Sequence, residues 1–181
     1  KIGIQHHHAH IASCMAEHNL DENVIGICFD GTGFGEDRNI WGGEFMIANL
    51  ADYQRISYFD YVPMPGGEKA IKEPWRMAIA YLYKTFGSSF SEIEIPFLKQ
   101  LNKESVGLLV AAINKSVNTP LTSSVGRLFD AVAAVIGLCL VNNFEAEAPM
   151  KLESIINEKI DTKYSYNFNK PSDNLNDLRV Y

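Results

Sequence analysis

Hydrophobic and polar positions over the first third of the chain predict one helix followed by strands. Within residues 6–20, apolar positions recur at i, i+3, i+4 and i+7, which favours an amphipathic helix that ends near Asn19. Residues 24–29 (VIGICF) form a short apolar run, which indicates a buried strand ending in the tight turn DGTGFGED. Residues 40–50 and 54–62 are rich in aromatic and β-branched side chains, so we expect an antiparallel pair of strands there.

The rest of the pattern is mainly helical. Pro74 is suited to the first position of an apolar-periodic helix, and Gly87 is expected to end that helix. Further along, the pattern predicts a Ser-rich loop at 88–95 and helices at 97–116 (one or two, broken around Ser105 or Gly107), 122–140 and 146–156. Within residues 161–181, the alternation KYSYNFNK predicts an edge strand, and the polar residues after it predict a loose C-terminal segment.

Composition narrows the class of protein. The 181 residues are 46% hydrophobic and 21% charged, which is typical of one globular domain or two small lobes. A formal charge of −6 gives no general drive toward nucleic acid or an anionic membrane, so neither is expected as a partner. The longest apolar stretch, 132–141, is about half of the roughly 20 residues that cross a bilayer. Three widely spaced cysteines fit no disulfide framework, which favours a reducing, cytoplasmic setting.

His6 and His10 are candidate metal ligands. They lie four residues apart, so on a helix both imidazoles project from one face, a spacing that suits Zn or Fe. No glutamate stands between them, which argues against a peptidase of the HEXXH type. His7 and His8 point about 100° and 200° around the helix from His6 and should be structural or solvent-facing. Two alternatives are a purification tag and polar surface histidines. Ala9 interrupts the histidine run, which argues against a tag.

Asp30 stands where the first strand meets a glycine-rich segment. Gly31, Gly33 and Gly35 could free backbone N–H groups to approach a phosphate or a metal-bound anion, and Asp30 could complete a His-His-Asp ligand set. The alternative is a plain hairpin turn whose glycines supply positive φ angles.

Ser124 to Asp130 (SVGRLFD) is a second candidate site. It begins a predicted helix, so Ser124, Arg127 and Asp130 would lie near a positive helix N-terminus that favours anionic or ribose hydroxyl groups. For Asp130 the alternative is a salt-bridge or helix-dipole carboxylate. Arg76 could pair with Glu73 or meet a substrate phosphate. No Ser-His-Asp or Cys-His set can be assembled, so catalytic residues stay unassigned.

Six ordered segments carry a resemblance. They are QHHHAHIASCMAEH, FDGTGFGEDRNIWGGEF, PMPGG, KEPWRMA, TSSVGRLFDAVAAVIGL and FEAEAPMKLE. Together they resemble the carbamoyltransferase domain of the hydrogenase-maturation family HypF, over residues 1 to about 155, which implies that residues 1–181 are part of that domain. That domain is similar to the universal tRNA threonylcarbamoyl-adenosine-forming proteins. The resemblance implies a partial α/β domain of the actin, Hsp70 and sugar-kinase (ASKHA) superfamily, with a mixed sheet, flanking helices and a nucleotide cleft between two lobes.

The same resemblance implies site residues. The family's metal ligands fall on His6, His10 and Asp30, and a further aspartate ligand belongs to a motif that this sequence does not contain. The family's nucleotide-binding residues fall on Gly31, Thr32, Gly33, Gly126, Asp130 and Glu145, although Ala146 and Glu147 depart from the usual motif. The chain is therefore expected to be a fragment, inactive on its own.

The chemistry implied is carbamoyl transfer. A separate adenylate-forming domain would make carbamoyl adenylate from carbamoyl phosphate and ATP, and this domain would pass the carbamoyl group to the C-terminal cysteine of a HypE-like protein, toward the cyanide ligands of NiFe-hydrogenase. The cofactors implied are a divalent metal, Fe or Zn, or Mg accompanying nucleotide. Three alternatives stay open: an O-carbamoyltransferase acting on a small-molecule hydroxyl, a non-catalytic nucleotide- and metal-binding fragment, and a cytosolic interaction protein with surface histidines.

Overall fold

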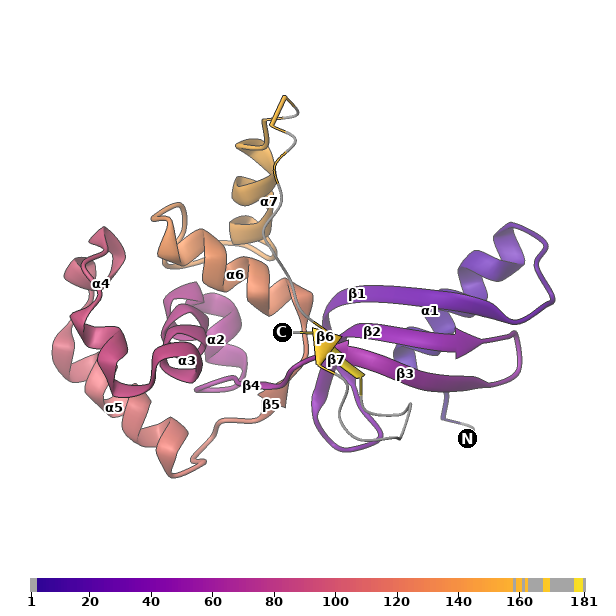
Figure 1. Cartoon of the computed structure of the whole chain (residues 1–181), viewed down its shortest axis with the longest axis horizontal. Coiled ribbons are helices and arrows are strands. Elements are labelled where there is room, and N and C mark those ends of the chain that lie inside the picture. Colours follow the sequence, from indigo (N-terminus) through magenta and orange to yellow (C-terminus); the bar gives the residue numbers. More distant parts are fainter. Residues whose placement is uncertain (1–2, 158, 161, 163–167, 170–177, 181) are drawn as a thin grey trace. The chain divides into compact units, whose positions relative to one another are not determined.

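The computed structural model describes residues 3–157, 159–160, 162, 168–169 and 178–180 (Figure 1). The chain divides into two compact units. Unit 1 comprises Lys1–Tyr61, Ser123–Val125 and Lys163–Tyr181, and unit 2 comprises Val62–Thr122 and Gly126–Thr162. Unit 1 holds most of a mixed sheet with one helix, whereas unit 2 is mainly helical, so the predicted α/β class with a mixed sheet is confirmed.

The N-terminal helix of unit 1 is α1 (His6–Glu17), close to its predicted bounds. It begins at Gln5, whose side-chain oxygen accepts a hydrogen bond from the backbone N–H of His8 at 3.0 Å. It ends where Asn19 adopts a positive φ of 54°, which lets the N–H of Leu20 reach the carbonyl of Met15. Both ends are therefore set by side chains suited to caps.

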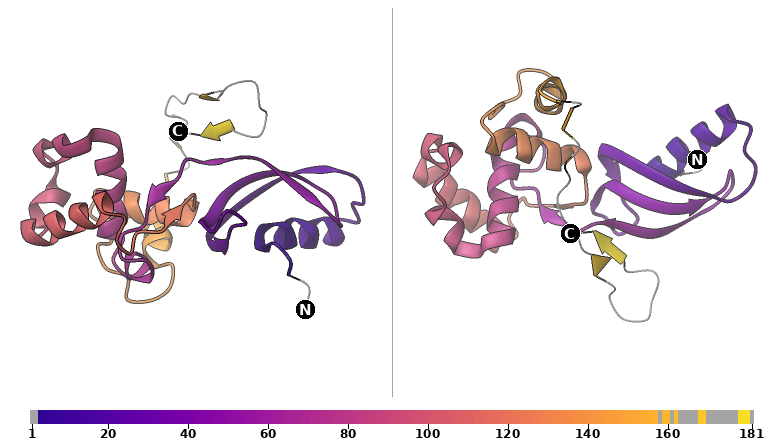
Figure 2. Two further views of the ribbon diagram at one scale, coloured as in Figure 1. Left: turned by 90° about the horizontal axis from the view of Figure 1, so that it is seen from below. Right: turned by 45° about the horizontal axis from the view of Figure 1, so that its top comes forward.

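The sheet of unit 1 is built around three antiparallel strands, β1 (Val24–Phe34), β2 (Ile40–Ala48) and β3 (Tyr53–Phe59). The predicted strand pair is confirmed as β2 and β3. Strand β7 (Leu178–Val180) runs parallel to β3, and β6 (Phe168–Asn169) runs antiparallel to β7, which makes the sheet mixed. Helix α1 lies along one face of β1–β3 (Figure 2). The core between helix and sheet contains Ile11, Met15, Cys28, Trp41, Met46 and Ala48.

Strand β1 corrects two predictions. It continues to Phe34, so DGTGFGED is not the turn; the turn lies at Gly35–Asn39, closed by a bond from the N–H of Gly35 to the carbonyl of Asn39. The pairing of β1 with β2 changes register between Phe29 and Gly33, which accommodates the glycine-rich segment within the strand. The strand is also not buried on both faces: Ile25 is 74% exposed, because α1 covers only the opposite face.

Unit 2 packs short helices around its own core. Its elements are β4 (Val62–Pro63), α2 (Glu68–Lys72), α3 (Pro74–Phe86), η1 (Gly87–Glu92), α4 (Pro96–Gln100), α5 (Lys103–Asn114), β5 (Leu121–Thr122), α6 (Val125–Val135) and α7 (Glu147–Ser154). Strands β4 and β5 pair antiparallel. Buried side chains include Met64, Met77, Ile79, Phe97 and Leu109, and a smaller cluster joins Ala133, Cys139 and Ala148. The helix from Pro74 to Gly87 is confirmed, with Gly87 at a φ of 59°.

Three element predictions in unit 2 were wrong in detail. The segment at 88–95 contains the 3-10 helix η1 instead of a loop. The break in 97–116 falls at 101–102, because the side chain of Asn102 caps α5 by accepting from the N–H of Ser105 at 2.9 Å. Helix α6 is shorter than 122–140, since Thr122 belongs to β5 and Gly137, at a φ of 81°, follows the helix end.

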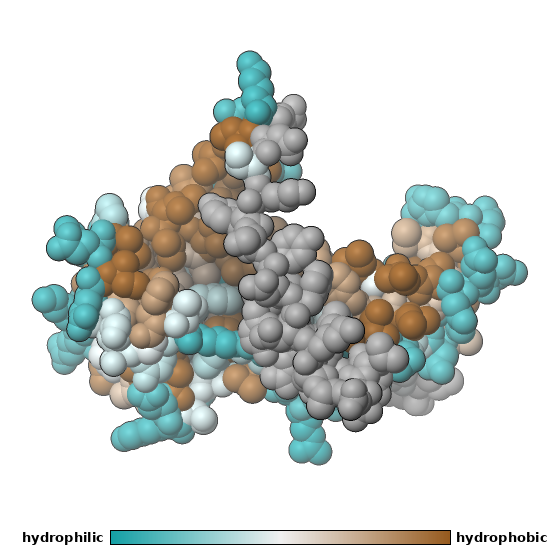
Figure 3. Space-filling model, viewed as in Figure 1, coloured by the Kyte–Doolittle hydropathy of each residue, from teal (hydrophilic) through white to brown (hydrophobic). Residues whose placement is uncertain are grey.

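Hydrophobic side chains reach the surface on both units (Figure 3). On β1 they are Ile25, Ile27, Phe29 and Phe34, and on α6 they include Phe129 and Val132. No helix among the described residues is long and apolar enough to cross a membrane. Of the predicted edge strand and loose segment at 161–181, β6 and β7 are described; the remainder lies outside the described residues.

Candidate metal and nucleotide site

His6 and His10 approach each other on the exposed side of α1. Their Nε2 atoms lie 3.2 Å apart, and their rings meet edge to face with centroids 4.6 Å apart. The His6 side chain is 48% exposed, and His10 is also exposed. Both imidazoles therefore present a nitrogen to the same accessible point.

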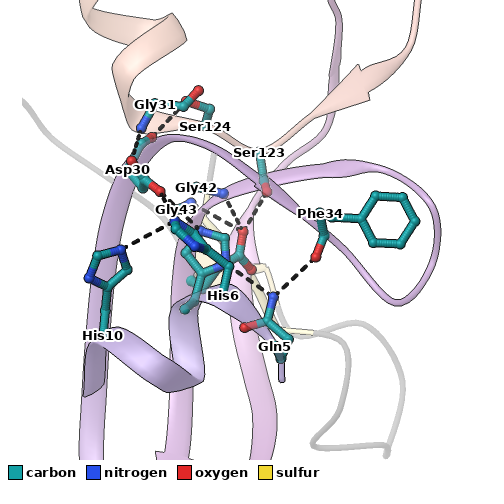
Figure 4. Close-up of polar contacts among 12 residues, drawn as sticks. Gln5, His6, His10, Asp30, Gly31, Phe34, Gly42, Gly43, Ser123 and Ser124 are labelled. Atoms are coloured by element: carbon teal, nitrogen blue, oxygen red, sulfur yellow. Dashed lines mark hydrogen bonds and ion pairs between the residues drawn. The ribbon is translucent and has the colours of Figure 1, made fainter. Parts of the chain in front are cut away.

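Asp30 reaches this point from strand β1 (Figure 4). Its Oδ2 lies 2.8 Å from the Nε2 of His6, and its Oδ1 accepts a hydrogen bond from the N–H of Gly31 at 2.6 Å. Ser124 fixes the backbone there, because its hydroxyl donates to the carbonyls of Asp30 and Gly31 at 2.7 and 2.8 Å. One ligand atom from each of His6, His10 and Asp30 lies within 4.8 Å of the other two.

The donor set suits a divalent transition metal. Two bonds of about 2.0–2.1 Å to imidazole nitrogens at a tetrahedral angle separate those nitrogens by about 3.3 Å. The observed separation between His6 and His10 is 3.2 Å. Two imidazoles and a carboxylate are ligands that Zn and Fe accept, and three protein ligands leave a position for water or substrate. These three residues, predicted as one site, are brought together by the fold.

Strand β2 packs against the backbone of Asp30, a contact that residue types alone do not predict. A Cβ at Gly42 would lie 2.5 Å from the carbonyl of Asp30, so only glycine permits this approach. Glu44 is fully buried and accepts from the N–H groups of Gly42 and Gly43 and from the hydroxyl of Ser123. Arg55 neutralises it at 2.6 Å. The segment WGGEF carried the signal, since a glutamate beside two glycines is unusual in a buried strand.

His7 and His8 are both buried. His8 is structural, as one of the two expectations had it: its Nε2 lies 2.8 Å from the carbonyl oxygen of Asn49 and its ring packs on Tyr53. The His7 side chain is 0% exposed, and its Nε2 lies 3.9 Å from the Oδ2 of Asp30. Burial lowers the pKa of His7, which favours its neutral imidazole.

The glycine-rich segment after Asp30 serves close packing. Gly31, Gly33 and Gly35 are not among the glycines with positive φ, so the hairpin-turn explanation is wrong. A Cβ at Gly33 would lie 2.3 Å from Cε1 of His7 and 3.0 Å from Cδ2 of His6. The N–H of Gly31 is bound to Asp30, and Thr32 is exposed. Nucleotide binding by Gly31, Thr32 and Gly33 stays a prediction.

The other predicted nucleotide residues belong to unit 2. Gly126 and Asp130 lie on α6, where Asp130 is fully buried and its Oδ2 is 2.8 Å from the Nε of Arg127. The salt-bridge alternative for Asp130 is therefore observed. Burial raises the pKa of Asp130 to about 6, and Arg127 opposes that rise. Glu145 is exposed beside a cavity that is also lined by Lys72 and Asn142. A ribose contact from Asp130 and a nucleotide contact from Glu145 stay predictions.

Arg76 pairs with Glu73, with 2.5 Å between its Nε and the carboxylate oxygen. Its guanidinium also lies over the ring of Trp75, 4.9 Å from the ring centroid. Of the two roles considered for Arg76, the structure contains the ion pair.

Comparison with known proteins identifies relatives. The family model described as carbamoyltransferase, Kae1-like domain, second subdomain, matches residues 26–180. The chain is 41% identical over 154 residues to carbamoyltransferase HypF2 of Cupriavidus necator, and 38% identical over 174 residues to carbamoyltransferase HypF of a Synechocystis species. These matches cover 85% and 89% of the chain but 18% and 23% of the relatives. The chain therefore spans about a fifth of the length of these curated relatives.

Two solved structures share the fold. One is a crystal structure of full-length HypF in the phosphate- and nucleotide-bound form, with a TM-score of 0.90 and 43% identity over 99% of this chain and 23% of that one. The other is HypF of T. kodakarensis, with a TM-score of 0.73 and 38% identity over 83% of this chain and 21% of that one.

Proposed function

Because the chain belongs to the family of Kae1-like domains of HypF carbamoyltransferases, we propose that it contributes the carbamoyl-transfer site of such an enzyme. The observation that carries the proposal is the convergence of His6, His10 and Asp30 from two elements onto one accessible point. The relatives of the chain are named carbamoyltransferases, and its exposed histidines lie beside a carboxylate. A reaction site at that point explains both observations better than polar surface histidines do.

His6, His10 and Asp30 are proposed to hold a divalent metal, Zn or Fe, with one position open. When bound, such an ion would polarise a carbonyl or phosphate oxygen as a Lewis acid. The chain's own residues orient the reaction: Ser124 and Gly42 hold the backbone of Asp30, and α1 holds the two imidazoles on one face. The 3.2 Å separation of the imidazole nitrogens supports this assignment.

The proposed substrate is carbamoyl adenylate. It would be formed from carbamoyl phosphate and ATP by a separate adenylate-forming domain, and Mg would accompany the nucleotide. We assign the nucleotide to Gly31, Thr32 and Gly33 and to Gly126, Asp130 and Glu145, within an ASKHA-type domain. A relative that was crystallised with nucleotide and phosphate supports nucleotide as a ligand of the family.

The proposed acceptor is the C-terminal cysteine of a HypE-like protein, on the route to the cyanide ligands of NiFe-hydrogenase. The thiolate attacks the carbamoyl carbon, a carbon–sulfur bond forms, and AMP leaves with the electrons of the broken bond. A thiol acceptor needs a reducing compartment, which supports a cytoplasmic location.

A chimera tests this function. In a full-length HypF relative, the region that matches this chain is replaced by the chain itself, and radiolabel transfer is measured from carbamoyl phosphate, in the presence of ATP, to an acceptor with a C-terminal cysteine. We expect transfer that His6→Ala combined with His10→Ala lowers by about two orders of magnitude or more, because a Lewis acid supplies several kcal/mol.

Two controls make the assay specific. His18→Ala, a change at an exposed histidine on the end of α1, should leave transfer unchanged, and an acceptor that lacks its terminal cysteine should receive no label. Full transfer by the His6 and His10 double variant, or labelling of the cysteine-free acceptor, would contradict the proposal.

A further inference from the structure

The side-chain amide of Gln5 has a defined orientation. One end accepts from the backbone N–H of His8 at 3.0 Å, so that end is the oxygen. The other end must then be the NH₂ group, which donates to the carbonyl of Phe34 at 3.3 Å (Figure 4). The same NH₂ group lies 3.2 Å from the Nδ1 of His7. Two backbone contacts therefore identify the group that faces His7 as a donor.

This orientation decides which nitrogen of His7 carries the proton. A donor facing Nδ1 requires that Nδ1 be the acceptor of the ring. An imidazole ring carries at least one proton, so when Nδ1 is the acceptor that proton is on Nε2. Gln5 thus acts as both helix cap and tautomer lock, and it presents the Nε2–H of His7 to the far side of the ring.

That N–H faces the candidate metal site. The Nε2 of His7 is buried and has no hydrogen-bond partner in the described part of the chain. The nearest carboxylate oxygen, Oδ2 of Asp30, is 3.9 Å away, too far for a hydrogen bond. Gly33 leaves room for the ring on this side, because any Cβ there would lie 2.9 Å from Nε2. A buried donor without a partner is costly unless a ligand satisfies it.

We propose that the Nε2–H of His7 donates a hydrogen bond to the carbonyl oxygen of the carbamoyl group held at the His6–His10–Asp30 site. This inference rests on the proposed function. When the acceptor adds to the carbamoyl carbon, negative charge develops on that oxygen, and a preorganised donor stabilises it. No proton is transferred from His7, which therefore differs from a general acid. His7 is thus assigned as a substrate-contacting residue distinct from the metal ligands.

Cobalt(II) and bicarbonate provide the test, since bicarbonate, like a carbamoyl group, has a planar carbon that carries a hydrogen-bond-accepting oxygen. The visible absorption of the cobalt-loaded chain reports both the affinity for cobalt and the affinity for bicarbonate. Four proteins are compared: the parent, His7→Leu, which removes the donor, His7→Gln, which keeps an N–H donor, and His8→Leu, which removes the neighbouring buried imidazole.

We expect His7→Leu to keep cobalt affinity within about threefold and to weaken bicarbonate about tenfold, the value of one hydrogen bond to a charged group. His7→Gln should recover part of the bicarbonate affinity, and His8→Leu should change neither affinity by more than about threefold. Unchanged bicarbonate affinity in His7→Leu would overturn the inference. Equal losses of cobalt and bicarbonate would also overturn it, because His7 would then act only through Asp30.

Nitrogen-15 NMR of the metal-free chain reads the tautomer independently of metal and of activity. We expect the proton on Nε2 of His7, and a proton on Nδ1 alone would remove the inference. If the parent fails to bind cobalt, the proposed function and the inference fail together. Cobalt binding with any of the overturning results above removes the inference and leaves the proposed function standing.

Discussion

Asp30 and Asp130 are two carboxylates that each lie beside a basic side chain, and they belong to different units. Asp30 has His6 at 2.8 Å and its side chain is 30% exposed. Asp130 has Arg127 at 2.8 Å and its side chain is fully buried. A similar distance therefore describes two different situations, because one carboxylate is partly exposed and the other is buried.

The two sites differ in whether the neighbouring basic side chain can act as a metal ligand. The imidazoles beside Asp30 can be neutral and offer lone pairs to a metal, whereas the guanidinium beside Asp130 is always protonated and offers none. Burial then decides the energetics: breaking an exposed pair costs little, and breaking a buried pair leaves a charge without compensation. We accordingly expect metal binding to depend on Asp30 and folding stability to depend on Asp130.

The largest expected effect is on stability at Asp130. Asp130→Ala should lower the free energy of unfolding by about 3–5 kcal/mol, because the buried charge of Arg127 loses its carboxylate. Asp30→Ala should lower it by only about 0–1 kcal/mol, as for an exposed pair. Urea denaturation of the parent and both variants measures the difference. Equal destabilisation by the two variants would remove the distinction drawn here.

The second effect is a pH dependence of folding stability that arises at Asp130. Burial raises its folded pKa from 3.8 to about 6, so between these values the folded state binds more protons than the unfolded state. The Asp130 contribution to the free energy of unfolding should therefore be full below about pH 4 and fall by about 3 kcal/mol as pH rises to 6.

The difference between parent and Asp130→Asn, followed from pH 4 to 7, isolates this contribution from that of other carboxyl groups. Asparagine does not titrate, so the stability gap should narrow as pH rises through the window. A gap that is constant with pH would show that the pKa of Asp130 is not raised.

Gly33→Ala should produce a smaller loss, in unit 1. The added Cβ would lie 2.3 Å from Cε1 of His7, so the ring must move, which we expect to cost about 1–3 kcal/mol of folding free energy. Because His6 is also within 3.0 Å, metal affinity should fall as well. Calorimetric titration with Zn²⁺ and denaturation on the same variant check both. Unaltered Zn²⁺ affinity would show that Gly33 does not position the site.

Gly107→Ala gives the matched change in unit 2 and the smallest effect. Gly107 is an exposed residue inside α5, and a Cβ there meets nothing within 4 Å. Alanine should raise the free energy of unfolding by about 0.5–1 kcal/mol through the lower entropy of the unfolded chain and better helix propensity. A decrease in thermal stability would contradict the finding that a Cβ at Gly107 meets no other atom.

Residue spacing was sufficient to predict the parts of the site that depend on local geometry. His6 and His10 follow from four-residue spacing on a helix, and the helix follows from its apolar stripe. Asp30 could be placed beside them because the chain returns along β1 after a short connection, although the strand continues past it instead of ending there. The α/β class with a mixed sheet came from the resemblance of six ordered segments to a known family, and the observed sheet is mixed.

What spacing could not supply depends on long-range packing. Gly33 leaves room for the ring of His7, and Gly42 leaves room for the backbone of Asp30. Both roles depend on how closely two segments approach each other in the fold. For the glycine-rich segment that contains Gly33, the residues alone suggested a turn. Burial of Asp130 against Arg127 likewise needed the packing around α6, since a polar helix start is usually solvated. The predicted helix ends were wrong where a capping side chain sets the end, as Asn102 does for α5.

The most direct measurement is the Zn²⁺ affinity and stoichiometry of the purified, tag-free chain, by calorimetry and by metal analysis. We expect about one ion per chain, with affinity lowered at least about a hundredfold by His6→Ala combined with His10→Ala and unchanged by His18→Ala. Retention of full affinity by the double variant, or an equal loss in His18→Ala, would contradict the claim that His6, His10 and Asp30 form a metal site.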